Sequence, residues 1–151
     1  MSKSFEEQFI KSKGNPFIFE YREVRLSYKL KLVDPPISFI IKDVKTKSEW
    51  VQGIVVSVPN GIVNINGFKG PRMVLWEDII PKIIHFTVEE GDELIIYNVW
   101  KVRPDGAMMY GHNGAGLCVH IKGDYSWFIE CNDGFPDAKF EDLSFNLLKN
   151  N

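Results

Sequence analysis

The sequence predicts an all-β protein: a single antiparallel β-sandwich, jelly-roll-like or immunoglobulin-like, with a short N-terminal helix. From Phe17 onward, apolar side chains recur at every second position, which is the period of a half-buried strand. Turn-forming sequences interrupt these runs about every 8–12 residues, a spacing typical of sandwiches and barrels. No helical stretch of crossover length separates the runs, so a parallel β-α-β arrangement is not expected.

The N-terminal helix is predicted from its cap and its apolar spacing. Ser4 followed by Glu7 is a capping-box pattern, in which each side chain satisfies an otherwise orphaned backbone N–H. Phe5 and Phe9 lie one turn apart on one face, and the sequence Gly14-Asn15-Pro16 ends the element. We therefore divide the 151 residues into a helical segment packed on the domain and one sandwich domain, 1–16 and 17–151.

The alternating runs number about nine or ten. Pro59-Asn60-Gly61 and Gly123-Asp124 are expected to form tight hairpin turns, because Asn and Gly tolerate positive φ angles. The segment Arg72–Pro81 fits either a strand followed by a helical turn or one bulged strand, since Pro81 excludes a continuous helix. The expected strands are residues 17–22, 28–32, 37–44, 50–58, 62–66, 82–88, 93–102, 117–122, 125–131 and 143–148.

Composition indicates a globular chain and excludes some partners. The hydrophobic fraction is 44% and the charged fraction 25%, with a formal net charge of -2. A surface that binds nucleic acid or an anionic membrane needs excess Lys and Arg, so neither partner is expected. The charged start lacks the apolar core of a secretory signal, which favours a cytoplasmic protein; a mature secreted form whose signal was removed stays open.

The hairpin around Gly123-Asp124 supplies the first candidate site. With those two residues as the loop, His120 would face Trp127, and alternation would place both on one sheet face with Tyr125. Cys118 and Cys131 would share that face, and the other face would pack into the core. Such an aromatic face could hold a sugar ring, a base or a partner protein, and the alternative is that a helix or loop buries it.

An acidic stretch after this hairpin supplies the second candidate. Hard oxygen ligands of this kind suit calcium, but the spacing does not match an EF-hand loop. The interpretation that we favour is a solvated loop, with Asn-Asp-Gly making a turn and Asp142 capping backbone groups, while calcium binding is the alternative. The side chains concerned are those of Asn132, Asp133, Asp137, Glu141 and Asp142.

The sequence gives weaker support to a metal site, a phosphate-binding loop or a catalytic site. His112, Cys118, His120 and Cys131 are zinc-ligand types, yet they lack a compact ligand pair, so we assign no metal site. The glycine-rich segment Gly111–Gly116 precedes an expected strand rather than a helix, which excludes the phosphate-binding loops. No serine-hydrolase or metalloprotease motif is present, and we therefore predict no catalytic residues.

Three short segments, Tyr97–Trp100, Cys131–Gly134 and Phe140–Phe145, together resemble cytoplasmic immunity-type proteins of bacterial toxin systems. The last of them is also similar to the closing strand of jelly-roll carbohydrate-binding domains. The first resemblance implies a small protein that neutralises a toxin by binding it without catalysis. The second implies a glycan ligand on an aromatic face, with a structural calcium.

From the sequence we expect a non-catalytic protein-interaction module that needs no cofactor. The most specific version of this expectation is an immunity-type protein that binds a toxin. Acidic side chains of the 130–142 stretch would meet a basic partner surface and speed the encounter. The alternative is a carbohydrate- or small-ligand-binding β-sandwich that depends on calcium, with His120, Tyr125 and Trp127 as its ligand face.

Overall fold

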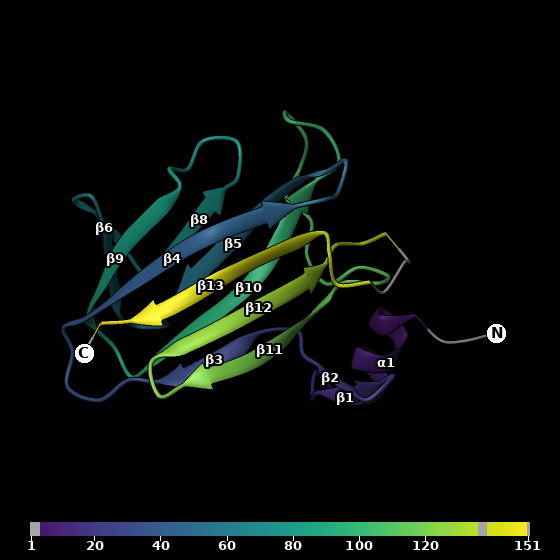
Figure 1. Ribbon diagram of the computed structural model, residues 1–151, viewed down its shortest axis with the longest axis horizontal. Coiled ribbons are helices and arrows are strands. Elements are labelled where there is room, and N and C mark those ends of the chain that lie inside the picture. Colours follow the sequence, from purple (N-terminus) through teal and green to yellow (C-terminus); the bar gives the residue numbers. More distant parts are fainter. Residues whose placement is uncertain (1–3, 136–138, 151) are drawn as a thin grey trace.

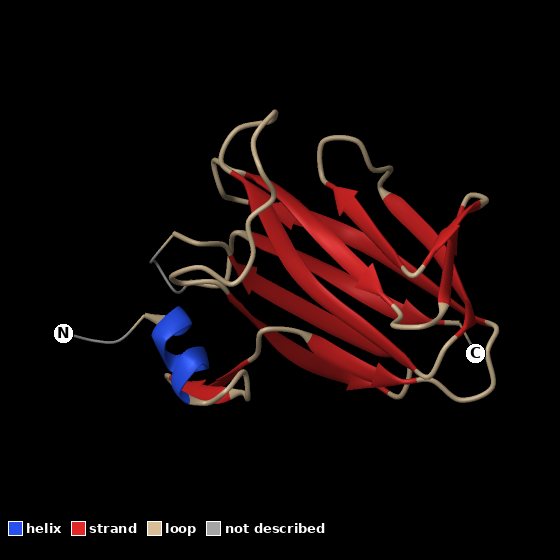
Figure 2. Cartoon of the chain, turned by 180° about the vertical axis from the view of Figure 1, so that it is seen from behind, coloured by secondary structure: helices blue, strands red, loops and turns tan. Residues whose placement is uncertain are grey.

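The computed structural model describes residues 4–135 and 139–150, and it confirms the all-β sandwich. Figure 2 shows the short helix α1 beside a body made of strands. The described elements are α1 (Phe5–Lys11), β1 (Phe17–Phe19), β2 (Arg22–Val24), β3 (Tyr28–Lys31), β4 (Ile37–Thr46), β5 (Val51–Ser57), β6 (Ile62–Ile65), β7 (Phe68–Gly70), β8 (Arg72–Trp76), β9 (Ile83–Glu90), β10 (Glu93–Lys101), β11 (Gly116–Gly123), β12 (Ser126–Asn132) and β13 (Leu143–Lys149).

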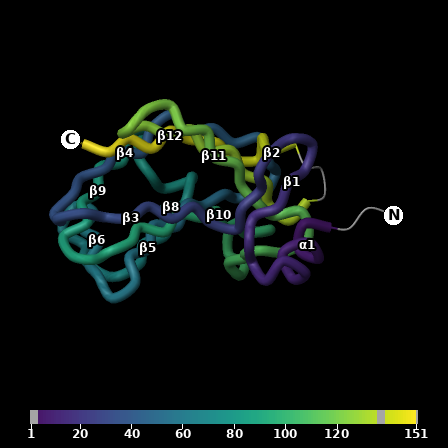
Figure 3. Tube along the Cα trace, turned by 90° about the horizontal axis from the view of Figure 1, so that it is seen from below, coloured from purple at the N-terminus to yellow at the C-terminus, as the bar shows by residue number. Residues whose placement is uncertain are grey.

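Two antiparallel sheets form the layers of the sandwich (Figure 1 and Figure 3). The seven-stranded sheet has the order β11-β12-β13-β4-β9-β6-β7, and the four-stranded sheet has the order β3-β10-β5-β8. The strands β1 and β2 form a separate two-stranded ribbon near α1. Among the described residues, no helix has the length and apolarity needed to cross a membrane.

The main core fills the space between the two sheets. Alternate residues of each strand point inward, as the period of two requires. Phe39 of β4 and Phe86 of β9 stack with ring centroids 5.2 Å apart, and Ile54 and Ile96 contribute from the opposite sheet. The described strands outnumber the expected runs because positive φ angles at Glu20 and Tyr21 break the run 17–22, and because β7 and β8 were not counted.

The helix packs on the outside of the sandwich and forms a second, smaller core. Ser4 Oγ accepts a hydrogen bond from Glu7 N at 3.2 Å, so the predicted N-cap is confirmed. Phe5 and Phe9 are buried against Val24, Cys118 and Phe140. The helix and β2 together thereby cover Cys118, near the start of the edge strand β11.

The hairpin expected at Pro59-Asn60-Gly61 is wrong. The chain crosses there from β5 in the four-stranded sheet to β6 in the seven-stranded sheet, so the two strands do not pair. The tight hairpin turn of this region is Asn66-Gly67, between β6 and β7, where both residues have positive φ angles. In the segment 72–81 the first alternative holds: β8 ends at Trp76, whose carbonyl oxygen accepts 3.1 Å hydrogen bonds from the next turn.

Candidate functional site

The predicted aromatic face on the β11–β12 hairpin is not formed. His120 pairs with Phe128 and Ile121 pairs with Trp127, so the register differs by one residue from the expected one. The turn residues are Asp124 and Tyr125, and a bulge lies between Ile121 and Gly123. A slip of one residue moves a side chain to the opposite face, and the predicted set is therefore divided between the two faces.

Trp127 lies in the main core with 6% of its surface exposed, and its ring packs near Tyr28 at 6.5 Å. His120 lies on the outer side of the same sheet, where its Nε2 atom is 2.6 Å from Glu130 Oε1 and its ring stacks on Phe128. Tyr125 lies in the turn with its ring beside Lys149. The alternative that the N-terminal helix buries this face holds for Cys118, which packs with Phe5 and Phe9, but is wrong for Trp127, which the opposite sheet buries.

The two cysteines lie on opposite sides of the sheet, contrary to the expected common face. Cys118 packs under the helix, Cys131 packs in the main core, and both are free thiols. Burial raises the pKa of Cys118 to about 11 and raises the pKa of Cys131 well above its ordinary value. Thiols held protonated in this way are poor nucleophiles.

Within the described residues, no three His, Cys, Asp or Glu side chains are grouped to hold a metal ion.

The acidic stretch is not a solvated loop where the structure describes it. Asn132, Asp133 and Asp142 are buried, because each satisfies polar groups of neighbouring segments. Glu141 is exposed, as expected, and its carboxylate lies 3.6 Å from Lys47 Nζ. Asp137 lies outside the described residues. The capping role of Asp142 is confirmed, since its Oδ2 atom accepts a 2.9 Å hydrogen bond from Asp133 N.

Asp133 is the centre of a buried polar cluster, which we define as Ser48, Gln52, Asn132, Asp133 and Asp142. Its carboxylate accepts from Phe135 N at 2.9 Å, from Gln52 Nε2 at 3.0 Å and from the hydroxyl of Ser48. The turn expected at Asn-Asp-Gly is therefore an Asx turn, closed by Asp133. These bonds attach the loop after β12 to the loop between β4 and β5.

Asn132 extends this network through both its backbone carbonyl and its side chain. Asn98 of β10 donates to Asn132 O at 2.8 Å, and Asn132 Oδ1 accepts from Phe140 N at 2.5 Å. Gly134 packs against the ring of Trp100 so closely that an added Cβ would lie 2.7 Å from it. A residue without a side chain is therefore needed at this position of the loop.

An open pocket lies over the polar cluster, and we call it the end pocket. Two aromatic rings form part of its wall: Trp50 stacks on Trp100 at 6.4 Å, and Phe135 meets Trp50 edge to face at 5.9 Å. Sequence reasoning missed both aromatic residues, although Phe135 lies within the acidic stretch. The pocket has a volume of about 240 Å³ and is lined by Lys47, Ser48, Glu49, Trp50, Phe135 and Asp142.

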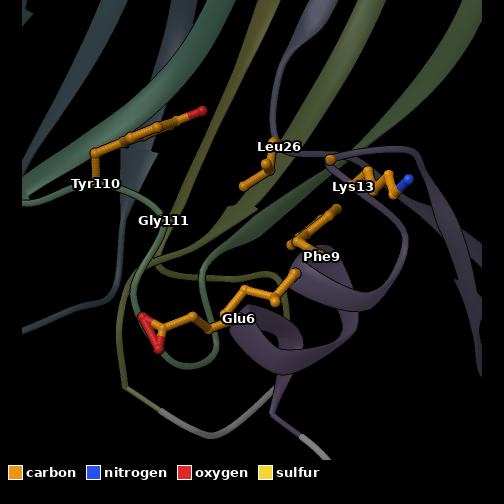
Figure 4. Close-up of a pocket in the computed structure, with 8 residues that line it drawn as sticks. Glu6, Phe9, Lys13, Leu26, Tyr110 and Gly111 are labelled. Atoms are coloured by element: carbon orange, nitrogen blue, oxygen red, sulfur yellow. The ribbon is translucent and has the colours of Figure 1, made fainter.

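A second hollow, the helix groove, lies between α1 and the loop before β11 (Figure 4). Phe9 and Leu26 form its apolar floor, and Tyr110 comes from the facing loop. Glu6 Oε1 lies 3.2 Å from His112 Nδ1, and Glu6 N donates to Asn113 O at 2.7 Å, so the helix is joined to this loop. The groove has a volume of about 390 Å³.

The largest of the three hollows is the edge groove, where the two sheets diverge beside β8. It has a volume of about 480 Å³. Three large apolar side chains on its rim are mostly exposed: Phe68 at 74%, Ile79 at 75% and Ile83 at 51%. The complete lining is Ile65, Asn66, Phe68, Val74, Leu75, Ile79, Ile80, Pro81, Ile83, Ile84 and His85.

Two strands next to the edge groove have unpaired backbone along one side. The strand β8 is the edge of its sheet and pairs with β5 alone. In β9, Ile83 to Phe86 pair with β4 on one side, and no described residue pairs with them on the other, because β6 meets β9 only from Thr87 to Glu90. The groove therefore combines exposed apolar side chains with free backbone donors and acceptors.

No family model, curated protein or solved structure matches this chain.

Proposed function

We propose that this protein is a non-catalytic protein-interaction module that holds its partner at the edge groove. The observation that carries the proposal is the grouping of Phe68, Ile79 and Ile83, each more than half exposed, around one hollow. Exposed apolar patches of this kind mark interaction sites, because covering them removes apolar surface from water. These side chains are not part of the main core, which supports a role for them in contact with a partner.

The occupant that fits the groove is a partner segment in extended conformation. The free side of β8 offers backbone N–H and C=O groups to an added strand, as in other complexes that extend a sheet by one strand. Alternate side chains of such a strand would point into the hollow between Leu75 and Ile84. We therefore expect a partner segment with apolar residues at every second position.

The toxin-neutralising form of this function rests on the sequence resemblance alone and stays a prediction. The acidic contact surface expected for it is smaller than proposed, because Asp133 and Asp142 are buried and Glu141 is paired with Lys47. The alternative function, binding of a carbohydrate or small ligand, no longer has the His120–Trp127 face on which it was based. Its remaining place is the end pocket.

The test is a selection of random twelve-residue peptides against the protein, followed by binding measurements on the peptides that are recovered. We expect sequences with alternating apolar residues that lose at least tenfold in affinity for the double variant Phe68→Ser/Ile79→Ser. The matched control is Ile18→Ser, since Ile18 is as exposed as these residues but lies on β1. Recovery of no peptide, or equal loss in the control, would contradict the proposal.

A further inference from the structure

We propose that the end pocket binds an organic cation, namely the guanidinium or alkylammonium group of an arginine or lysine side chain. This proposal does not depend on the edge groove, because it uses different residues. It rests on the aromatic wall of the pocket and on the charged side chains that line it.

The aromatic wall is held in place from behind. The Trp50 ring lies nearly parallel to that of Trp100, with 12° between their planes, and Trp100 is fully buried. Phe135 is 57% exposed, and its backbone N–H is held by Asp133. The exposed ring of Phe135 therefore offers a π-face to a cation at the pocket wall, and this attraction is stronger when the cation is partly removed from water.

The charges around the pocket are mostly negative. Glu49 and Asp142 line it, and Asp133 lies beneath Ser48. The ammonium group in the lining belongs to Lys47, and it already lies 3.6 Å from Glu141. Among the described lining residues, two carboxylates therefore stand against one ammonium group, which already pairs with Glu141, and the resulting field attracts a positively charged group.

Hydrogen-bond acceptors lie under the aromatic wall. Gln52 is fully buried, and its Nε2 atom donates to Trp50 O at 3.1 Å and to Asp133 Oδ2. Its Oε1 atom has no hydrogen-bond partner among the described residues. Gln52 does not line the pocket, so this acceptor lies behind the wall, and the acceptors that a bound cation meets in the pocket are the carboxylates of Glu49 and Asp142.

A small organic cation fits this pocket better than a metal ion or a glycan. The oxygens of Asp133 already accept from three protein donors, which leaves them poorly placed to ligate calcium. The ring of Trp50 is stacked on Trp100 and crossed by Phe135, so it does not present a broad open platform for a sugar. A volume of about 240 Å³ suits the end of one side chain.

The test is an NMR titration of the whole protein with N-acetyl-arginine methylamide, with the Trp50 indole N–H as the reporter. We expect saturation with a Kd of about 1–10 mM, which is usual for one small contact site. The lysine analogue should bind in the same range, and the citrulline analogue, which has the same shape without the charge, at least tenfold more weakly. The double variant Glu49→Gln/Phe135→Leu should lose the shift, and the control Glu20→Gln, remote from the pocket, should keep it.

Several outcomes would overturn the proposal. The first is equal binding of the arginine and citrulline analogues. The second is a saturable Trp50 shift with methyl glycosides or calcium chloride but not with the arginine analogue. The third is the absence of any Trp50 shift. Loss of binding in Glu20→Gln to the same degree as in the double variant would also overturn it. Because the titration does not involve Phe68 or Ile79, its failure leaves the edge-groove function intact.

Discussion

The end pocket and the edge groove differ in what the fold buries and what it exposes. Beneath the end pocket, the polar side chains of Gln52, Asn132 and Asp133 are fully buried. At the edge groove, the apolar side chains of Phe68 and Ile79 are about three-quarters exposed. Residue type alone would predict the reverse. Burial depends on the partners that each position meets in the fold. The polar side chains make hydrogen bonds with neighbouring segments, whereas the apolar ones lie on the rim of an open groove.

This difference separates residues that hold the fold together from exposed residues that we propose to contact a partner. Substitutions in the polar cluster should lower stability because they leave buried groups without partners. Substitutions at the groove rim should leave stability unchanged and affect binding alone. The following predictions test that separation, beginning with the largest expected effect.

Trp127→Ala should lower the free energy of unfolding by about 3–5 kcal/mol, the usual cost of removing a large aromatic side chain from a core. Tyr125→Ala, two residues earlier but in the turn, should change it by less than about 1 kcal/mol. Urea unfolding followed by circular dichroism measures both values. Equal effects of the two substitutions would mean that the pair shares one face, as the hairpin was first expected to present it.

Asp133→Ala should lower the free energy of unfolding by about 3 kcal/mol, because the Phe135 N–H, the Ser48 hydroxyl and the Gln52 amide would all lose their acceptor. Glu141→Ala is the matched control, since its exposed ion pair contributes less than about 1 kcal/mol. The same urea experiment compares them. An Asp133→Ala protein as stable as the control would show that the loop is solvated after all.

Alkaline pH should destabilise the protein through its buried thiols. The pKa of a thiol in the unfolded chain is about 8.5, whereas the pKa of Cys118 in the folded protein is raised to about 11. Between these values the unfolded chain binds fewer protons than the folded chain, so the free energy of unfolding falls as pH rises. Unfolding of the wild type at pH 7.5 and pH 10 should differ more than unfolding of Cys118→Ala at the same two values. Equal slopes would contradict this assignment.

Phe68→Ser and Ile79→Ser should each change the free energy of unfolding by less than about 0.5 kcal/mol, because most of each side chain is already in water. Thermal unfolding of the single variants measures this. A loss of 2 kcal/mol or more in either variant would assign the side chain to the core and remove the contrast between the two regions.

Local patterns in the sequence predicted the elements that depend on neighbouring residues. The cap at Ser4, the apolar pair Phe5 and Phe9, and the strand alternation all arise from contacts within a few positions. The turn at Asn132-Asp133-Gly134 was predicted for the same reason. The partners of Asp133 were not, because Ser48 and Gln52 are more than eighty positions away in the chain.

The sequence by itself determined the fold class, because a period of two in the apolar residues permits extended strands and excludes long helices. Tertiary structure alone decided the two hollows that we propose as binding surfaces. A bulge of one residue beside Gly123 placed Trp127 in the core, and contacts between distant segments brought Gln52 to Asp133 and Trp50 to Phe135. Register and sheet assignment depend on contacts between remote segments, and alternation along one strand cannot encode which neighbour it meets or which face is left open.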